Sequence, residues 1–559
     1  MKPIALFKFL VLNLLLGSCA PASEERDPNV FRYNEASGIS SLDPAFARVQ
    51  SNIWAVGMLF NTLVELDSAL EIRPGLAVRW EQSDDGLEYR FRLRSDVWFH
   101  QNPCFDADPE SRRLRASDVV YSLKRLSDTG LASSGAWIVR PIDSLWAIGT
   151  DSVIVRLSEP FPPFLSTLAN AYCGVVSERA VAESGSEFGR RPVGTGPFAF
   201  KRWIPNEKMV LRRNPDYYET DAQGRSLPYL ESVAIRFLPD RKSSFLALLQ
   251  GEVDFISGLD PSYADELLDA SGQLSENYRD RLVLLKAPYL NTEYLGFGLE
   301  ALRGTPYANP EMRKALGWSI DRVALVRYLR RNVGIPARGG MLPNVLEGSL
   351  PLGSGWEYDP EKAAEALRLA GYPGGVGLPP IALHTGAEYL DIAEFVQSSA
   401  QRLGIPLEIE VMPSAALREG MANARFGMFR GSWIADYPES ENYLALFYSP
   451  NHSPKGPNYT HYTDPVFDSD YVALRAEIDE EPRIERARSM EARLLASAPV
   501  LPLWYDEVVR CTTPEWRGLA PDPLNRLDLR RVRSEREDVQ NREATSAPSQ
   551  SPPPSDSGR

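Results

Sequence analysis

The chain has 559 residues, of which 43% are hydrophobic and 24% charged, and its mean hydropathy is −0.28. This length predicts about three or four structural units rather than a single core. The net charge of −14 argues against nucleic-acid binding, because a phosphate-binding surface needs clustered Lys and Arg. The few histidines lie far apart in the sequence, so we expect neither a His-built metal site nor a Ser–His or Cys–His triad.

The N-terminus has the pattern of an export signal. In "MKPIALFKFLVLNLLLGSCA", two lysines flank an apolar run that is too short to span a bilayer comfortably, which predicts a signal peptide over residues 1–18. The ending "LGSC" resembles a bacterial lipobox, which implies that Cys19 becomes a lipidated N-terminus. An ordinary secreted protein with a chance cysteine is the alternative. Two acyl chains on Cys19 would anchor the chain to a membrane, and the polar residues 19–28 would form a tether.

Strands and helices alternate along the rest of the chain. "LEYRFRLR" (87–94) alternates apolar and charged residues, as a half-buried strand does. "ASDVVYSLKRL" (116–126) opens with a Ser-Asp cap and continues at helical spacing. The mixture predicts an α/β fold. Further expected elements are strands over 152–157, 232–238 and 407–412 and helices over 309–329, 359–372 and 392–404.

The end of the chain differs in composition. From residue 532 it has few apolar residues and much Ser, Pro and charge, so it cannot bury a core. We therefore predict a disordered tail over 532–559.

"SWIADYPESENY" (432–443) raises a question of chemistry. Asp436 stands between an apolar Trp-Ile-Ala run and a Tyr-Pro turn, with no His or Cys nearby to act as a catalytic partner. A surface acid needs no aromatic neighbours, and a catalytic acid usually needs a second group.

Ten short segments together resemble one family, the bacterial family 5 extracellular solute-binding proteins, which include the oligopeptide- and dipeptide-binding components of ABC importers. The resemblance covers nearly all of residues 30–530, and the segments follow the family order. They include "SLDPAFA" (41–47), "PGLAVRWEQSDDGLEYRFRLRSDVWFH" (74–100), "RPVGTGPF" (191–198), "LLQGEVDF" (248–255), "MRKALGWSIDR" (312–322), "WIADYP" (433–438) and "APVLPLW" (498–504).

The resemblance implies a two-lobed periplasmic-binding-protein-like α/β fold of class II (cluster C), with two crossing strands, a hinge and an extra subdomain inserted in lobe I. The expected boundaries are 29–65, 195–285 and 496–531 for lobe I, 66–194 for the inserted subdomain and 286–495 for lobe II.

The resemblance also assigns a role to Asp436. In peptide-binding members, the Asp three residues after this tryptophan forms a salt bridge with the free α-ammonium group of the ligand. A closed, desolvated cleft strengthens such an attraction, and Trp433 and Tyr437 would limit access of water. The alternative is that Asp436 caps a turn or pairs with a protein cation such as Arg430.

Main-chain pairing with the ligand is implied next to this acid. Ser432 and Ile434 alternate with Trp433 in an extended segment, and their N–H and C=O groups would bind the peptide like an added β-strand. The segment "RVQS" (48–51) would supply the opposing edge, with Val49 as the best-matched position.

Three further cysteines would lie in an oxidising compartment and allow at most one intramolecular disulfide. Cys104 and Cys173 fall in the expected inserted subdomain, so they are the favoured pair, whereas Cys511 does not. Three buried thiols are the alternative.

The function that follows is a lipid-anchored, monomeric receptor in the cell envelope, periplasmic or extracytoplasmic, that captures di- or oligopeptides and delivers them to an ABC permease. It is not expected to be an enzyme or to hold a cofactor or metal. The same fold with a non-peptide solute, such as an oligosaccharide, an opine or a nickel chelate, is the alternative. A hydrolase is disfavoured because the sequence has no GxSxG elbow or zinc motif. Two segments depart from the family pattern. The insertion over 101–116 alters a surface loop of the extra subdomain. Pro438–Glu441 replaces the Asp-Pro-Asp common in the family, which changes the charge pattern beside the expected cleft and weakens any inference about peptide preference.

Overall fold

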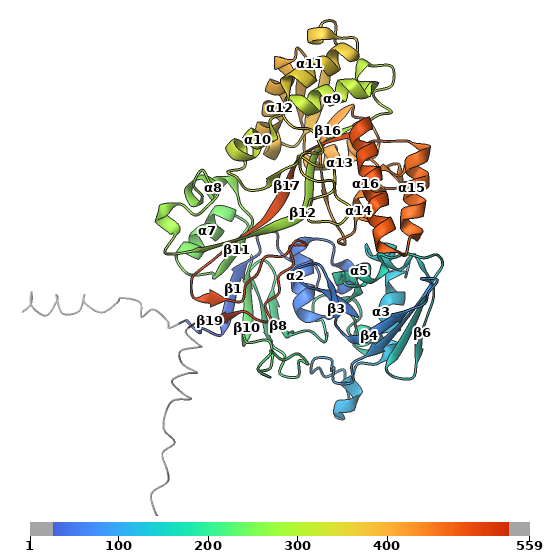
Figure 1. Cartoon of the computed structure of the whole chain (residues 1–559). Helices are drawn as coiled ribbons and strands as arrows, with labels where there is room; N and C mark the ends of the chain where they lie inside the picture. Colours follow the sequence, from blue (N-terminus) through green and yellow to red (C-terminus); the bar gives the residue numbers. More distant parts are fainter. Residues whose placement is uncertain (1–25, 536–559) are drawn as a thin grey trace, which may run out of the picture.

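The computed structural model describes residues 26–535, in two lobes connected by long strands (Figure 1). The predicted signal peptide, Cys19 and residues 536–559 lie outside the described residues. One eleven-stranded mixed sheet passes through both lobes. In spatial order its strands are β15 (Leu407–Val411), β14 (Ile381–Thr385), β16 (Met428–Ile434), β12 (Val283–Phe297), β17 (Val500–Thr512), β11 (Phe255–Ser257), β1 (Val30–Asn34), β10 (Ser232–Arg236), β9 (Lys208–Arg213) and β8 (Phe198–Ile204), with β13 (Ile335–Pro336) paired to β17.

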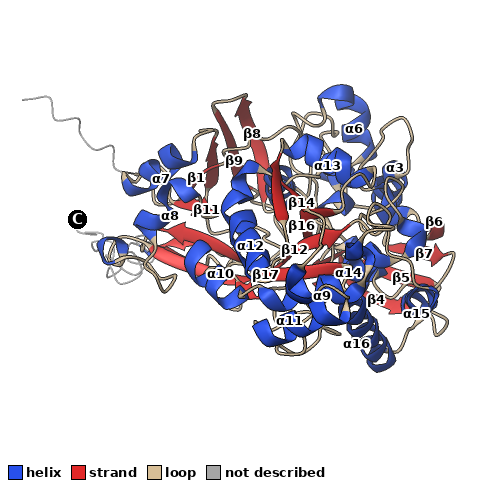
Figure 2. Cartoon of the chain, turned by 90° about the horizontal axis from the view of Figure 1, so that it is seen from above, coloured by secondary structure: helices blue, strands red, loops and turns tan. Residues whose placement is uncertain are grey.

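β12 and β17 are the two crossing strands that the resemblance implies. They run antiparallel over most of their length, and a register shift between Pro288 and Thr292 interrupts their ladder. β17 pairs with β11 at one end, while β12 pairs with β16 at the other, so the two strands carry the sheet from lobe I into lobe II (Figures 1 and 2). A ladder interruption permits local bending. The expected boundary at 285/286 falls inside β12, and the one at 495/496 falls inside α16 (Glu480–Ser497). The exact lobe limits therefore stay predictions.

Lobe I shares one hydrophobic core with the inserted subdomain. The subdomain has a four-stranded antiparallel sheet, and the buried residues of this sheet and of β1 belong to the same apolar cluster. The predicted strands at 87–94, 152–157 and 232–238 and the helix at 116–126 are confirmed. In spatial order, the strands of the subdomain sheet are β4 (Ala77–Gln82), β5 (Glu88–Leu93), β7 (Ser152–Leu157) and β6 (Ile142–Ile148). The helices of lobe I and the subdomain include α2 (Gln50–Leu59), α3 (Ala116–Leu126), α4 (Ala136–Val139) and α5 (Phe164–Leu168). Helices α7 (Arg241–Leu249) and α8 (Pro261–Leu267) pack beside β11 in a separate cluster.

Lobe II is predominantly helical around β14, β15 and β16 (Figure 2). The single helix predicted over 309–329 was wrong: α9 ends at Ser319 and α10 begins at Arg322, because Asp321 accepts the Ala324 N–H (2.9 Å) and caps a new helix. A single continuous helix would have placed Val323 on the same face as Leu316 and Ile320, which are buried, whereas Val323 is 52% exposed in α10. The helices are α9 (Pro310–Ser319), α10 (Arg322–Leu329), α11 (Pro360–Leu369), α12 (Leu390–Arg402), α13 (Ser414–Ala422), α14 (Ser440–Leu444), α15 (Pro465–Ala476) and α16, so the helices expected at 359–372 and 392–404 and the strand at 407–412 are present.

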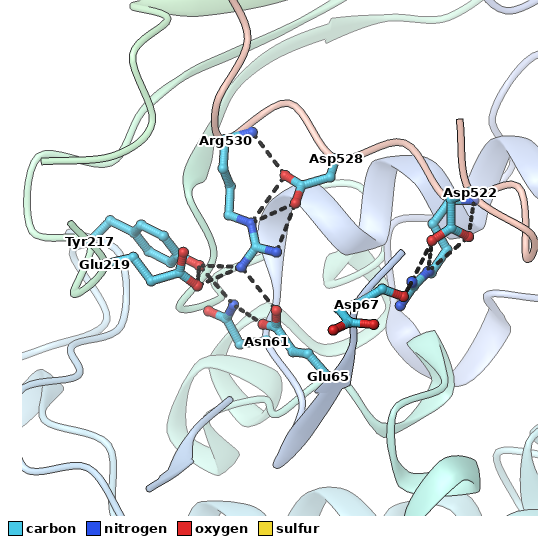
Figure 3. Close-up of polar contacts among 9 residues, drawn as sticks. Asn61, Glu65, Asp67, Tyr217, Glu219, Asp522, Asp528 and Arg530 are labelled. Atoms are coloured by element: carbon cyan, nitrogen blue, oxygen red, sulfur yellow. Dashed lines mark hydrogen bonds and ion pairs between the residues drawn. The ribbon is translucent and has the colours of Figure 1, made fainter. Parts of the chain in front are cut away.

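After β17 the chain returns along lobe I, where partly buried ion pairs hold it in place (Figure 3). Arg530 forms ion pairs with Glu65 (2.9 Å), Asp528 (2.8 Å) and Glu219. Beyond it, β19 (Arg533–Ser534) pairs with β18 (Trp516–Arg517). The first residues of the predicted tail, 532–535, are therefore ordered.

The predicted Cys104–Cys173 disulfide is wrong. Cys104, Cys173 and Cys511 are all buried and free. The Cys173 thiol is directed to the Thr167 carbonyl (3.8 Å) instead of to another sulfur. Burial raises the pKa of Cys104 to about 11 and those of Cys173 and Cys511 to about 12, so these thiols stay protonated and behave as apolar core groups.

Candidate functional site

Asp436 lies just after β16, at the boundary between the lobes. The Asn170 side-chain amide, from the inserted subdomain, donates to the Asp436 carbonyl (3.2 Å). The Asp436 side chain is accessible to solvent, but protein surrounds it closely enough that desolvation raises its pKa, partly offset by a hydrogen bond from Asn442. Among residues 26–535 no cation forms an ion pair with this carboxylate. The group is thus a partly desolvated acid without a counter-charge.

The cation nearest to Asp436 in the sequence is already paired elsewhere. Arg430 forms a buried salt bridge with Glu293, and its guanidinium lies 3.4 Å from the centroid of the Tyr389 ring. Burial raises the pKa of Glu293, and the Arg430 charge opposes this shift. Arg430 is therefore not the partner of Asp436.

Aromatic residues border the acid in fixed positions. The Trp433 indole N–H donates to Asn442 Oδ1 (2.9 Å), and the Tyr437 hydroxyl donates to Glu441 (2.5 Å). Tyr437 also stacks on Trp137 of the inserted subdomain, with ring centroids 5.6 Å apart. Tyr437 is buried, so it contributes a wall of the site rather than a polar group for a ligand.

The outer edge of β16 has free main-chain groups next to Asp436. Ala435 N–H donates to Leu290 O of β12 (2.8 Å). Because hydrogen-bonded pairs alternate along an antiparallel ladder, the main-chain groups of Trp433 face β12, whereas those of Ser432 and Ile434 face away from it. β14 pairs with β16 only at residues 428 and 429, so it does not cover this part of the edge. Ser432 and Ile434 are both exposed.

Val49 lies in lobe I with an extended backbone (φ −106°, ψ 153°), but it caps α2 and does not belong to a strand. Of the expected edge over 48–51, only Arg48 and Val49 precede the helix. Val49 is 50% exposed and lines an interlobe cavity of about 370 Å³. The opposite wall includes Tyr289, Arg330 and Asp506, on or beside the crossing strands.

A cluster of polar residues beside this cavity was not predicted. Asn291 donates to Glu293 (3.1 Å) and to Asp506 (3.4 Å), and Arg330 pairs with Asp506 (3.5 Å). Two atoms in the cluster, Asn291 Oδ1 and Arg330 Nε, are buried without a hydrogen-bond partner. No signal in the sequence joins Arg330 and Asp506 to the Asn291–Glu293 segment of β12, because these three segments lie far apart along the chain.

Two kinds of feature are absent from the part of the chain that the structure describes, metal-binding clusters and membrane-spanning helices. Within 26–535 no group of three or more His, Cys, Asp or Glu could hold a metal ion. In the same range no helix combines the length and apolarity that a membrane span requires. The polar groups of the site are suited to binding a charged solute.

Comparison with known proteins identifies the family. Residues 71–455, more than half of the chain, match the model "Bacterial extracellular solute-binding proteins, family 5 Middle". The chain belongs to this family of solute-binding proteins. It is 27% identical over 526 residues to "Glutathione-binding protein GsiB" of Escherichia coli O1:K1 / APEC, covering 92% of this chain and 95% of that protein.

Solved structures agree on the fold of this family 5 chain. The structure of HbpA2 from Haemophilus parasuis has a TM-score of 0.79 at 23% identity and covers 90% of this chain and 99% of its own. The periplasmic binding protein DppA from Helicobacter pylori, solved with the peptide STSA, has a TM-score of 0.71 at 25% identity, covering 90% and 98%. These similarities establish the two-lobed solute-binding fold.

Proposed function

We propose that this family 5 protein captures short peptides between its lobes and delivers them to the transmembrane subunits of an ABC importer. Asp436 would bind the ligand α-ammonium group, and the free edge formed by Ser432 and Ile434 would pair with the ligand main chain. Val49 would contact the ligand from lobe I, and Trp433 and Tyr437 would exclude water. The relatives named above as binding glutathione or a peptide support a peptide-like ligand.

One observation carries this proposal: Asp436 is a partly desolvated carboxylate without a cation, placed beside an uncovered strand edge. Every unmodified peptide carries one positive charge at its N-terminus, whatever its side chains. A single fixed acid therefore suits a receptor that accepts many sequences, and main-chain pairing adds about 0.5–1.5 kcal/mol for each bond without reading side chains.

Calorimetry with tri-alanine and N-acetyl-tri-alanine tests the anchor directly. We expect the acetylated peptide, which has no ammonium group, to bind at least about a hundredfold more weakly. Equal affinities would reject an ammonium anchor. Native mass spectrometry of protein purified from cells tests the ligand class: mixed peptide masses support the proposal, whereas a uniform sugar or metal-chelate mass would replace it with the alternative solute.

The location of the receptor is part of the same proposal. Lipidation of Cys19 would hold the monomer at a membrane surface in the cell envelope, within reach of the permease. Metabolic labelling with a radioactive fatty acid should mark the wild-type protein and leave Cys19→Ser unlabelled. Equal labelling of both proteins would contradict lipidation at Cys19.

A further inference from the structure

The interlobe cavity contains an acid that the peptide-receptor proposal does not use. Glu35 directly follows β1 and lines the cavity of about 370 Å³. One of its carboxylate oxygens accepts the Ser37 N–H (3.2 Å). In the described part of the chain no cation forms an ion pair with this carboxylate, because the nearby Arg241 lies against Asp260 instead (3.8 Å). Glu35 is therefore a half-buried acid without a direct counter-charge.

The other two acids that line the cavity already have cations beside them. Asp506 pairs with Arg330 (3.5 Å), and Glu507 lies 3.8 Å from the Lys286 ammonium group. Burial raises the pKa of Glu35, and the hydrogen bonds from its own turn and the nearby positive charge offset this shift only in part. A cation that enters the cavity would therefore gain most at Glu35, where it displaces no protein partner.

The cavity lies at the carboxyl ends of two parallel strands of lobe I. Glu35 follows β1, and Ser257 and Gly258, at the end of β11, line the same cavity. In open α/β sheets, ligands bind outside the carboxyl ends of parallel strands. At its carboxyl end β1 lies between β10 and β11, so it has no free edge for the main chain of a peptide. Glu35 thus offers a charge to a ligand side chain, unlike Asp436, which stands beside a free strand edge.

Apolar side chains line another part of the cavity. They include Val49, Trp54, Ile256, Leu259 and Val509. Lys and Arg side chains combine a long apolar stem with a charged end. A cavity with an apolar wall and an acid that has no cation complements a side chain of this kind in both respects.

The cavity adjoins the strand edge proposed for the ligand main chain. Tyr289 lines the cavity, and the carbonyl of the next residue, Leu290, accepts the N–H of Ala435, which directly precedes Asp436 (2.8 Å). A peptide whose first residue is held at Asp436 would therefore have its later side chains close to the cavity. Building on the proposed function, we infer that the protein prefers peptides with Lys or Arg after the first residue, and that this side chain enters the interlobe cavity and pairs with Glu35.

A double-mutant cycle between protein and ligand tests the assignment. The ligands are Ala-Lys-Ala and Ala-Ala-Lys, each with a counterpart in which norleucine replaces lysine and removes only the side-chain ammonium group. By calorimetry we expect at least one lysine peptide to bind the wild type about tenfold or more tightly than its norleucine counterpart, and this difference to vanish in Glu35→Gln. Glu81→Gln, which removes an exposed acid on β4, is the matched control and should keep the wild-type difference.

The outcomes separate this inference from the function on which it rests. Equal or weaker binding of both lysine peptides in the wild type would overturn the role of Glu35 while leaving a peptide receptor, and so would a lysine preference that persists in Glu35→Gln. If no tripeptide binds the wild type, tri-alanine included, the peptide-receptor function itself fails. The melting temperature of Glu35→Gln should match or exceed the wild-type value, because glutamine keeps an oxygen for the Ser37 N–H and avoids a charge that burial disfavours.

Discussion

Asp436→Asn removes the charge that we assign to ligand binding and keeps the shape of the side chain. Two unit charges 4 Å apart attract by about 4 kcal/mol at an effective dielectric constant of about 20. Leaving a charge uncompensated in a buried site costs about 3–5 kcal/mol. We take about 3–4 kcal/mol, because Asp436 keeps some access to solvent, and this energy corresponds to about a 150- to 1,000-fold increase in Kd.

The same substitution should not harm the fold. Desolvation raises the pKa of Asp436, which means that the folded protein without ligand disfavours the charged form. The neutral amide avoids that cost, so the melting temperature of Asp436→Asn should equal or exceed the wild-type value at pH 7. A structural role for the acid would predict the opposite sign.

Calorimetry with tri-alanine and differential scanning calorimetry without ligand together decide the matter. Trp433→Phe is a useful companion variant, because it loses one hydrogen bond to Asn442 and should weaken binding only about 2- to 13-fold. If Asp436→Asn kept its affinity within threefold, the ammonium anchor would be refuted. If it unfolded at a lower temperature, Asp436 would be a structural residue.

Three further predictions concern protons and packing. A bound ammonium would lower the raised pKa of Asp436, so peptide binding should release protons at acidic pH, and the affinity should weaken as the pH falls. Calorimetry in buffers of different ionisation enthalpy should detect this proton release in the wild type and not in Asp436→Asn. Gly135→Ala should cost about 1–3 kcal/mol of unfolding free energy, because its Cβ would overlap the Tyr172 ring, whereas Gly57→Ala, which has open space in α2, should be neutral or stabilising by urea denaturation. Burial raises the pKa of Glu491 from 4.5 to about 7, so this group contributes stability below pH 4.5 that is lost as the pH rises to about 7. Glu491→Gln should remove about 3 kcal/mol of that pH dependence, measured by urea unfolding at several pH values across this range. An unchanged pH profile in the variant would contradict the assignment.

Local patterns allowed much of the fold to be predicted. The alternation in 87–94 and the helical spacing in 116–126 fix β5 and α3 with little help from distant residues. At the start of α3, Asp118 accepts the Arg115 N–H (2.9 Å), whereas Ser117 lies inside the helix and does not cap it. The error at 309–329 arose where two local signals competed. Helical periodicity continues across the break, but Asp321 offers a cap for a new helix, and the structure uses this cap.

Only the part of the candidate site around Asp436 was predictable from the sequence. Asp436 and the extended segment before it stand out because unusual neighbours lie together in the sequence. Asn170 and Tyr172, which face Asp436 from the inserted subdomain, are more than 250 residues away along the chain.

Local neutralisation, rather than the net charge of −14, determines where a cationic group can bind. Several acids lie near the boundary between the lobes, but Glu293 is paired with Arg430, and Asp506 with Arg330. An ammonium group placed at either of these would have to displace an arginine, whereas at Asp436 it replaces only solvent. In the proposed site, the paired acids would therefore direct the positive end of a ligand to Asp436, and the rest of the ligand would pass the strand edge of β16. The orientation of the ligand in the proposed site would then follow from which of the acids already have an arginine partner.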